Sequence, residues 1–353
     1  MGRKLVFIVR KFDYSFLHDL VPAKLINLTN FIYDIKGKED ARLNNSKDLF
    51  ESLKKKAIIE SITASNEIEN IITTAKRINE IASGDKPRTH AEEEISGYHK
   101  VINMIHNNYE NILFDETSIL NMHYEMLDIA KINNRAKYKH EVNIITETIN
   151  GKQFVRFIPI SPADTKEAMN QLFLAYYSAK NDPDISPLLL IPCVILDFLS
   201  IHPFDDGNGR MSRLLTLLLL YKNGFDIGRF ISIEKVINES KDQYYRVLQE
   251  SSIGWHENQN DYYPFITYMI QVLDKCYQKL DDTVISQVSL NMNKKERIEY
   301  VLMNSIVPIS KADLIDKLPD ISTKSIESVL SNLLKEDKIR KIGTFKDAKY
   351  YRK

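Results

Sequence analysis

A short loop between two apolar stretches constrains the fold of this chain more than any other feature. The loop reads His202-Pro203-Phe204-Asp205-Asp206-Gly207-Asn208-Gly209-Arg210-Met211-Ser212-Arg213. Apolar runs flank it at 188–199 and 214–221. Each run is shorter than the roughly 20 residues that a membrane-spanning helix needs, so both are predicted to be buried core helices. The sequence therefore predicts two core helices joined by a polar, glycine-rich turn.

The loop combines the groups needed for chemistry on phosphates. A glycine-rich turn that opens a helix leaves backbone N–H groups free at the positive end of the helix dipole, which suits a phosphate. Arg210 and Arg213 can each hold phosphate oxygens through two hydrogen bonds. Asp206 offers the hard oxygens that Mg²⁺ prefers, and His202 is placed to act as a general base. A plain polar turn would need neither this histidine nor this order, so we interpret the loop as a nucleotide-phosphate site.

The rest of the chain is predicted to be mainly helical. Apolar residues fall at helical spacing through much of the first 110 residues, and further helices are expected at 116–130, 187–200, 210–223 and within 232–278. One β-hairpin is expected at 141–160, with Asn150-Gly151 as its turn. The chain is thus expected to form a helical bundle with a small hairpin.

The C-terminal region has a different pattern. A polar stretch at 281–293 is expected to be a linker, and helices at 294–303, 311–318 and 323–337 are followed by strands at 340–344 and 348–351. This order is typical of a winged helix. Residues 294–353 contain 14 Lys or Arg and 9 Asp or Glu, a balance of 14 − 9 = +5. The bases of the expected wing are Lys341, Lys346, Lys349, Arg352 and Lys353.

The role of this C-terminal region stays open between DNA binding and protein docking. The outward positions of the expected reading helix are only weakly basic, whereas phosphate contacts need Lys or Arg. Those positions are Lys324, Glu327, Ser328, Ser331 and Asn332. The wing suits DNA better than the helix does.

Composition limits the remaining function classes. The chain has 48 basic and 48 acidic residues, so its formal net charge of zero argues against a whole-surface role at nucleic acid or membrane. Cys193 and Cys276 are the two cysteines, and Cys193 lies in an apolar run. They suggest neither a disulfide framework nor a zinc site. We therefore expect a cytoplasmic protein that has no membrane partner.

The loop resembles the signature HPFx[DE]GNGRxxR of the Fic family and matches every fixed position. The resemblance covers roughly residues 53–269. It implies a Fic-type helical bundle and an enzyme that moves AMP from ATP onto a hydroxyl group of a target protein. By this resemblance His202 is the base, Asp206 binds Mg²⁺, and Arg213 holds the γ-phosphate. The residues implied to hold the α- and β-phosphates are Gly207, Asn208, Gly209 and Arg210.

A second segment resembles the family's inhibitory motif [ST]xxxE[GN]. It matches at Ser65, Glu69 and Asn70. The resemblance implies that Glu69 pairs with Arg213, so Glu69 is counted among the residues of the ATP site. A carboxylate on that arginine would compete with the γ-phosphate and repel it. The alternative is a capping box, in which Asn66 caps a helix and Glu69 is its third residue.

Two further elements are assigned to the site. The hairpin at 141–160 resembles the family's flap, whose edge would bind the target protein by strand addition. The alternative is an ordinary surface hairpin. Tyr244 and Tyr245 are candidates to face the nucleobase, the alternative being that they belong to the core.

The sequence as a whole predicts an autoinhibited Fic-type protein adenylyltransferase that uses ATP and Mg²⁺. The expected domains are an N-terminal helical region at 1–110, a catalytic core at 111–280, a linker at 281–293 and a winged helix at 294–353. Self-modification stays open. The alternatives are an enzyme that removes AMP, a donor other than ATP, and a DNA-binding regulator whose Fic portion senses nucleotide.

Overall fold

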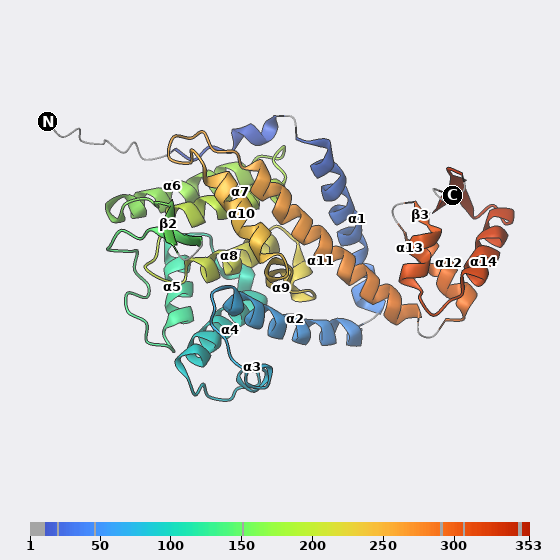
Figure 1. The fold of residues 1–353 in the computed structure, drawn as a ribbon, viewed down its shortest axis with the longest axis horizontal. Coiled ribbons are helices and arrows are strands. Elements are labelled where there is room, and N and C mark those ends of the chain that lie inside the picture. The colour runs from blue at the N-terminus through green and yellow to red at the C-terminus, as the bar shows by residue number, and fades with distance from the viewer. Residues whose placement is uncertain are drawn as a thin grey trace. The chain divides into compact units, whose positions relative to one another are not determined.

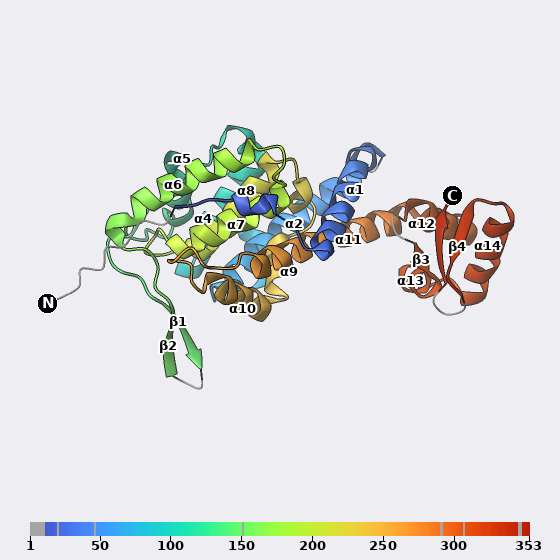
Figure 2. The same ribbon diagram turned by 90° about the horizontal axis from the view of Figure 1, so that it is seen from above.

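The chain folds mainly into helices with a few short strands, which confirms the expected mainly helical class (Figures 1 and 2). A computed structural model describes residues 11–19, 21–45, 47–149, 152–289, 292–305, 308–344 and 348–353. The chain divides into two compact units. The larger unit comprises Met1–Thr29 and Leu53–Cys276, and the smaller unit comprises Asn30–Ser52 and Tyr277–Lys353.

In chain order, the elements up to residue 289 are η1 Ser15–His18, α1 Ala23–Asn45, α2 Lys47–Ile68, α3 Ala75–Ala82, α4 His90–Asn108, η2 Tyr109–Asn111, α5 Glu116–Leu127, β1 Ile145–Ile149, β2 Lys152–Phe157, α6 Pro162–Lys180, α7 Pro187–Ile201, α8 Asn208–Lys222, η3 Asp226–Arg229, α9 Ile233–Asn238, α10 Lys241–Ser252 and α11 Tyr263–Ser289. The remaining elements are α12 Lys294–Asn304, β3 Ile309–Ser310, α13 Lys311–Lys317, α14 Thr323–Lys335, β4 Ile339–Ile342 and β5 Lys349–Arg352.

Helices α7 and α8 form the buried centre of the larger unit. All residues at 188–198 and 210–221 are buried, and these include the charged Asp197, Arg210 and Arg213 as well as the apolar runs. Helix α7 contacts α6, α8 and α10, and helix α8 also contacts α4. The prediction of two core helices joined by the loop is confirmed. Among the described residues, no helix has the length and apolar character needed to cross a bilayer.

Strands β1 and β2 form the predicted hairpin, which projects from the helices of the larger unit (Figure 2). The register pairs Ile145 with Phe157 and Thr146 with Val155, so Arg156 is the extra residue of a β-bulge. Asn150 and Gly151, the expected turn, lie outside the described residues. The bulge falls where the hairpin joins the helices.

Among the described residues from 292 onward, the smaller unit contains three helices, α12, α13 and α14, and a three-stranded antiparallel sheet in the order β3-β5-β4. Apolar residues from α12, α14, β4 and β5 form one core, among them Ile298, Leu330, Ile339 and Tyr350. The helices and the two terminal strands lie where the sequence predicts them, whereas β3 was not predicted. Lys346 of the expected wing lies outside the described residues.

The linker expected at 281–293 is wrong over residues 281–289, because α11 continues to Ser289. Polar residues dominate this stretch and conceal its helical pattern. Leu280, Val284 and Ile285 nevertheless follow one another at helical spacing, and all three are buried. Burial of this narrow apolar stripe is sufficient to extend the helix.

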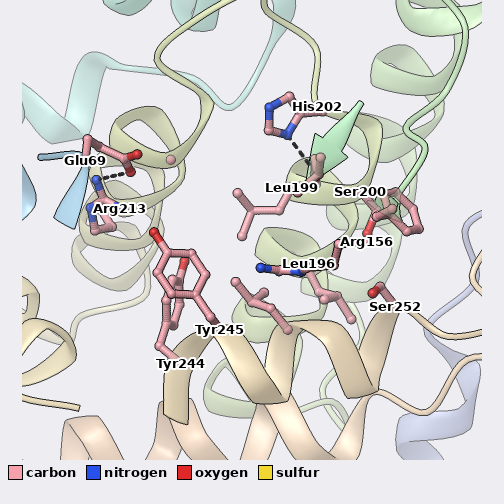
Figure 3. A pocket seen from close by; sticks show the side chains of 14 residues that line it. Glu69, Arg156, Leu196, Leu199, Ser200, His202, Arg213, Tyr244, Tyr245 and Ser252 are labelled. Atoms are coloured by element: carbon pink, nitrogen blue, oxygen red, sulfur yellow. Dashed lines mark hydrogen bonds and ion pairs between the residues drawn. The ribbon is translucent and has the colours of Figure 1, made fainter. Parts of the chain in front are cut away.

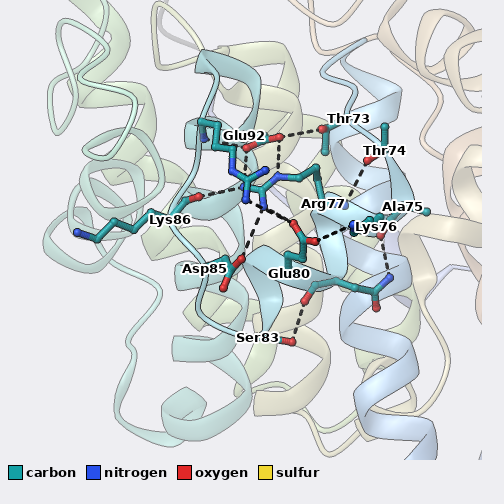
Figure 4. Close-up of polar contacts among 12 residues, drawn as sticks. Thr73, Thr74, Ala75, Lys76, Arg77, Glu80, Ser83, Asp85, Lys86 and Glu92 are labelled. Carbon is teal, nitrogen blue, oxygen red and sulfur yellow. Dashed lines mark hydrogen bonds and ion pairs between the residues drawn. The ribbon is translucent and has the colours of Figure 1, made fainter.

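A charged cluster fixes the segment between α2 and α4 (Figure 4). Arg77 binds Glu92 through two hydrogen bonds, of 3.0 Å from Nε and 2.9 Å from NH2, and it also binds Glu80. Glu92 accepts further hydrogen bonds from the Arg88 amide and the Thr73 hydroxyl. The hydrogen bonds from Arg77 are the main cause that lowers the pKa of Glu92 to about 2. This cluster ties down the chain that follows the C-terminal end of α2.

We predict that Glu92→Gln lowers the melting temperature at neutral pH and that the difference from the original protein shrinks as the pH falls. A carboxylate whose folded pKa is depressed stabilises the protein above its ordinary pKa of 4.5, and this contribution is lost as the pH falls toward about 2. Thermal unfolding of both proteins between pH 7 and pH 2.5 measures the difference. A gap that stays constant over that range would contradict the role of the Arg77–Glu92 pair.

Candidate functional site

His202 is the residue at which α7 ends. Its backbone is left-handed, with φ 51° and ψ 63°, and its amide donates to the Phe198 carbonyl at 2.9 Å. Its Nδ1 lies 3.2 Å from the Leu199 carbonyl oxygen (Figure 3). Because a carbonyl only accepts hydrogen bonds, Nδ1 carries the proton in this contact. Nε2 of the neutral ring therefore has a free lone pair.

The environment of His202 favours the neutral ring. Burial is the main cause that lowers its pKa to about 4, and the positive charge of Lys139 acts in the same direction. The carbonyl of Leu199 and the negative charges of Glu69 and Asp206 oppose this shift without cancelling it. At neutral pH the imidazole can therefore accept a proton.

The loop after His202 is held by side chains that hydrogen-bond to its backbone. The Asn208 side chain accepts from the Phe204 amide at 3.0 Å and donates to the Phe204 carbonyl at 2.7 Å. Asn143 donates to the same carbonyl at 2.9 Å. Lys139 donates from Nζ to the Ile201 carbonyl at 2.9 Å, and burial lowers its pKa to about 8. The loop conformation thus depends on residues 139–143 as well as on its own asparagine.

His123 supports the loop from α5. Its ring stacks on Phe204 at 3.7 Å between centroids, and its Nδ1 accepts from the Ala136 amide at 3.1 Å. Nε2 is then the protonated nitrogen, and it donates to the Asp206 carbonyl at 3.1 Å. Burial lowers the pKa of His123 to about 4. This histidine has a positioning role, because both of its nitrogens hold backbone groups.

The N-terminus of α8 has the features of an anion site. Gly207 caps the helix with φ 82°, a left-handed conformation that glycine adopts at no steric cost. Arg210 is 2% exposed, and its NH1 lies 2.9 Å from Glu94 Oε2 while its NH2 lies 3.7 Å from Asp206 Oδ2. Within the described part of the chain, Arg210 Nε has no hydrogen-bond partner. A buried N–H group without a partner is costly, so it favours an incoming acceptor such as a phosphate oxygen.

Asp206 is the residue to test for magnesium. Its carboxylate is 59% exposed, and one oxygen accepts from the Gly207 amide at 2.6 Å. Across the described residues, no three His, Cys, Asp or Glu side chains are grouped as a metal site. Asp206 therefore fits Mg²⁺ as a single protein ligand, with phosphate oxygens and water completing the shell, as is common for Mg²⁺ at nucleotide sites.

The C-terminal end of α2 presents Glu69. Asn70 has φ 61°, its amide donates to the Glu67 carbonyl, and the Ile71 amide donates back to the Asn66 carbonyl at 2.9 Å. This pair of bonds is a Schellman motif, whose left-handed position is best filled by Gly or Asn. The alternative capping box at Asn66 and Glu69 is therefore wrong. Asn66 lies inside the helix and donates to the Ile62 carbonyl.

Glu69 and Arg213 form an ion pair with 2.8 Å between Oε1 and NH2. Arg213 also donates from Nε to Ser65 Oγ at 2.8 Å and from NH2 to the Ser65 carbonyl at 2.9 Å. Arg213 is 3% exposed, so this pair is shielded from water on the arginine side. Burial tends to raise the pKa of Glu69, but the charge and hydrogen bond of Arg213 prevail and hold it below its ordinary value. The pair predicted from the sequence is present.

Gly209 allows Glu69 to approach α8. A Cβ atom at this position would collide with Glu69 Oε1 and would lie 3.3 Å from Arg213 NH1. A glycine in the first turn of α8 is thus required for the carboxylate to reach the arginine.

Two cavities meet at Glu69, His202 and Gly209. The polar cavity has a volume of about 360 Å³ and is also lined by Glu94, Asp206 and Arg210. The apolar cavity has a volume of about 210 Å³ and is shown in Figure 3. Its other lining residues include Arg156, Leu196, Leu199, Arg213, Tyr244, Tyr245 and Leu248. The predicted phosphate and nucleobase residues therefore line two adjacent cavities.

Several residues of this region were not predicted from the sequence. Arg156 lines the apolar cavity, and its guanidinium carbon lies 5.5 Å from the centroid of the Tyr245 ring. A charge between the apolar residues Val155 and Phe157 could have indicated it. His123 sits among Ile119, Met122 and Met126 on one helix face, which is also a readable pattern. Glu94, Lys139 and Asn143 have no comparable sequence pattern.

Comparisons with known proteins agree with this geometry. Residues 113–220 match the model of the Fic/DOC family. Protein adenylyltransferase fic-1 of Caenorhabditis elegans is 27% identical over 126 residues, and protein adenylyltransferase Fic of Nematostella vectensis is 27% identical over 135 residues. These matches cover 35% and 38% of this chain but only 22% and 27% of the relatives. The chain therefore contains a Fic domain homologous to that of protein adenylyltransferases.

Solved structures share the fold. A Fic family protein from Desulfovibrio desulfuricans has a TM-score of 0.62 at 20% identity, covering 95% of this chain and 97% of that one. A Fic domain-containing signaling protein from Bacteroides thetaiotaomicron has a TM-score of 0.57 at 18% identity, covering 77% of this chain and 100% of that one. At these identities the likeness establishes the fold alone.

We predict that Asn70→Val destabilises the protein by about 1–2 kcal/mol, because a β-branched side chain is strained in the left-handed region. Asn70→Gly is the matched control, and it should unfold at nearly the same denaturant concentration as the original protein. Equilibrium unfolding in urea measures both variants. Equal midpoints for the valine and glycine variants would mean that the end of α2 does not adopt this conformation.

Proposed function

We propose that this protein moves AMP from ATP onto a hydroxyl side chain of a target protein and that its own Glu69 inhibits the reaction. The observation that best supports the proposal is a neutral, partly buried His202 beside the N-terminus of α8, where it lines both the cavity that contains Arg210 and the cavity that contains Arg213. Homology of the Fic domain to protein adenylyltransferases supports the reaction class.

In the proposed reaction His202 acts as the base. The target's hydroxyl oxygen bonds to the α-phosphorus as the bond from that phosphorus to the bridging oxygen of pyrophosphate breaks. Nε2 of His202 takes the hydroxyl proton, and pyrophosphate leaves with the bonding electrons. The contact from Nδ1 to Leu199 fixes the tautomer that this step needs. Nearby phosphate oxygens would raise the histidine's pKa from about 4 and so make it a stronger base.

The phosphates are assigned to the polar cavity. The first amides of α8, at Asn208, Gly209 and Arg210, supply the helix N-terminus for the α- and β-phosphates. Arg210 supports this assignment through its unpartnered Nε, while Glu94 holds the other side of the guanidinium. The Asn208 side chain contributes indirectly, because its donor and acceptor both bind Phe204. Arg213 is assigned to the γ-phosphate.

Asp206 is the residue that would hold Mg²⁺. When bound, Mg²⁺ neutralises the negative charge that develops on the leaving pyrophosphate. The carboxylate is exposed and borders the polar cavity, so it could share a Mg²⁺ ion with phosphate oxygens bound there.

Glu69 is proposed to inhibit by occupying Arg213. Glu69 and the γ-phosphate are both anionic acceptors, and Arg213 NH2 already donates to Glu69 at 2.8 Å. Binding ATP in the transfer geometry therefore requires the carboxylate to leave or the γ-phosphate to go elsewhere. The same carboxylate lines both cavities, so it also repels the phosphate chain electrostatically.

The nucleobase and the target protein are assigned to the apolar cavity and the hairpin. Tyr245 is half-buried and Tyr244 is 3% exposed, so Tyr245 offers more surface to a base. The hairpin is a two-stranded sheet, so an extended target segment can add to its edge. Exposed Ile144, Val155 and Ile158 supply apolar contacts for that segment.

DNA binding by the smaller unit stays a prediction. Its element order supports a winged helix, and Arg340, Lys341, Lys349 and Arg352 are exposed on the terminal strands. On α14, however, Glu327 places a carboxylate among the expected reading positions, and its ion pair with Lys311 of α13 at 2.7 Å occupies the charge of that lysine.

A second candidate function is removal of AMP from a modified protein. It is favoured by the place of Glu69, whose carboxylate lines the same cavities as His202. A carboxylate there could orient a water molecule toward the α-phosphorus of an attached AMP.

We predict that Glu69→Gly raises transfer of label from ATP, labelled at its α-phosphate, onto protein. A hydrogen bond to a charged group contributes about 1.5–3 kcal/mol. Loss of the Glu69–Arg213 contact should therefore raise the transfer rate about ten- to a hundredfold. The measurement is incorporation of label into protein in the presence of Mg²⁺, including the protein itself as acceptor. Unchanged incorporation would contradict the inhibitory role.

The matched control is the double variant Glu69→Gly with His202→Ala. It retains the open arginine and lacks the base, so its rate should be lower by about 10²–10⁴. A double variant as fast as the single one would remove His202 from the mechanism. Loss of an AMP-removing activity in Glu69→Gly would instead favour the second candidate function.

A further inference from the structure

We propose that Trp255 and His256 are positioning residues that hold the β1–β2 hairpin at a fixed place relative to His202. The inference rests on the proposed function in one respect, namely that the hairpin docks the target protein. Both residues lie in the turn between α10 and α11, far from the signature loop in sequence.

The hairpin needs such a support. It pairs with no other strand among the described residues, and isolated two-stranded hairpins are at best marginally stable in water. Much of its apolar surface is open to solvent, for example Ile144 at 49% and Val155 at 59%. Its position must therefore be set by contacts at its base, where β2 meets the helices.

Those contacts converge on Trp255 and His256. Phe157, the last residue of β2, stacks on the His256 ring at 5.4 Å between centroids and 11° between planes. It meets the Trp255 ring edge-on at 6.0 Å and 76°. His256 Nε2 lies 2.8 Å from the carbonyl oxygen of Ile158, which only accepts, so the histidine donates. The end of β2 is thus held by two rings and one hydrogen bond.

Trp255 is in turn fixed to the helix that delivers His202. Its indole N–H donates to Asp197 Oδ1 at 2.7 Å, and both residues are completely buried. Asp197 also accepts from the hydroxyls of Tyr14, at 2.8 Å, and Tyr262, at 2.9 Å. It lies on α7, little more than one turn before His202. The path from Phe157 through Trp255 and Asp197 to α7 places the hairpin and the base in one rigid frame.

This frame has a direct consequence for the reaction. Phe157, Arg156 and His202 line the same cavity, so a shift of β2 changes the distance between a docked hydroxyl and the base. A misplacement of about 1 Å can cost about a hundredfold in rate. ATP, which is assigned to α8 and its arginines, should bind equally well. Loss of the support should therefore reduce transfer more than nucleotide affinity.

His256 allows the inference to be tested without disturbing the core, because its side chain is exposed whereas Trp255 is buried. His256→Ala should speed amide hydrogen exchange in β1 and β2 by about tenfold, the equivalent of one lost hydrogen bond. His256→Gln retains a donor for Ile158 and should restore much of the protection. His18→Ala, which removes an exposed histidine paired with Asp182 outside the two site cavities, is the matched control.

The exchange result stands whether or not the protein transfers AMP, so the two proposals can fail separately. Unchanged exchange in the hairpin of His256→Ala, or faster exchange spread equally over α7 and α10, would overturn the positioning role. In the Glu69→Gly background, His256→Ala should reduce transfer about tenfold or more with Mg-ATP affinity unchanged. An equal loss of affinity and transfer would also overturn it. Absence of any transfer in Glu69→Gly alone would count against the proposed function instead.

Discussion

The contact between Arg213 and the end of α2 is the interaction on which the state of this site depends. Arg213 has three acceptors there, and two of them belong to Ser65. If Glu69 leaves, the serine contacts still hold the guanidinium in place and only the group facing the cavities is freed. The arginine is thereby preorganised for a phosphate oxygen rather than released into solvent. A buried cation that loses one of its partners is strongly stabilised by a new anion.

The catalytic groups depend on a few shared supports. Helix α7 delivers His202 and carries Asp197, while Asn208 of α8 holds the loop between them through Phe204. His123 fixes the same loop from α5 by stacking on Phe204 and donating to the Asp206 carbonyl. Supporting residues and proposed catalytic residues differ in their hydrogen bonds. His123 and Asn208 use the polar atoms of their side chains to hold backbone groups. His202 Nε2 and Arg210 Nε have no hydrogen-bond partner in the described part of the chain, and the proposed function assigns both groups to the substrate.

The sequence was sufficient to predict the two core helices, the hairpin and the terminal strands, because apolar runs and period-two alternation report burial directly. It also placed Glu69 opposite Arg213, through a motif whose last position is explained by the left-handed backbone of Asn70. It did not predict the support of the loop by Lys139 and Asn143, since both bind backbone carbonyls far away in sequence. Their own neighbourhood has no periodic pattern. Such contacts depend on tertiary structure.

Competition between Glu69 and the γ-phosphate is the central claim, and nucleotide affinity tests it most directly. Calorimetric titration of Mg-ATP and Mg-ADP into the original protein and Glu69→Ala separates the γ-phosphate from the rest of the nucleotide. We predict that removing the carboxylate tightens ATP binding about ten- to a hundredfold, the equivalent of one charged hydrogen bond, and tightens ADP binding much less. Arg213→Ala should abolish that preference. An equal gain for both nucleotides, or none for either, would contradict the competition.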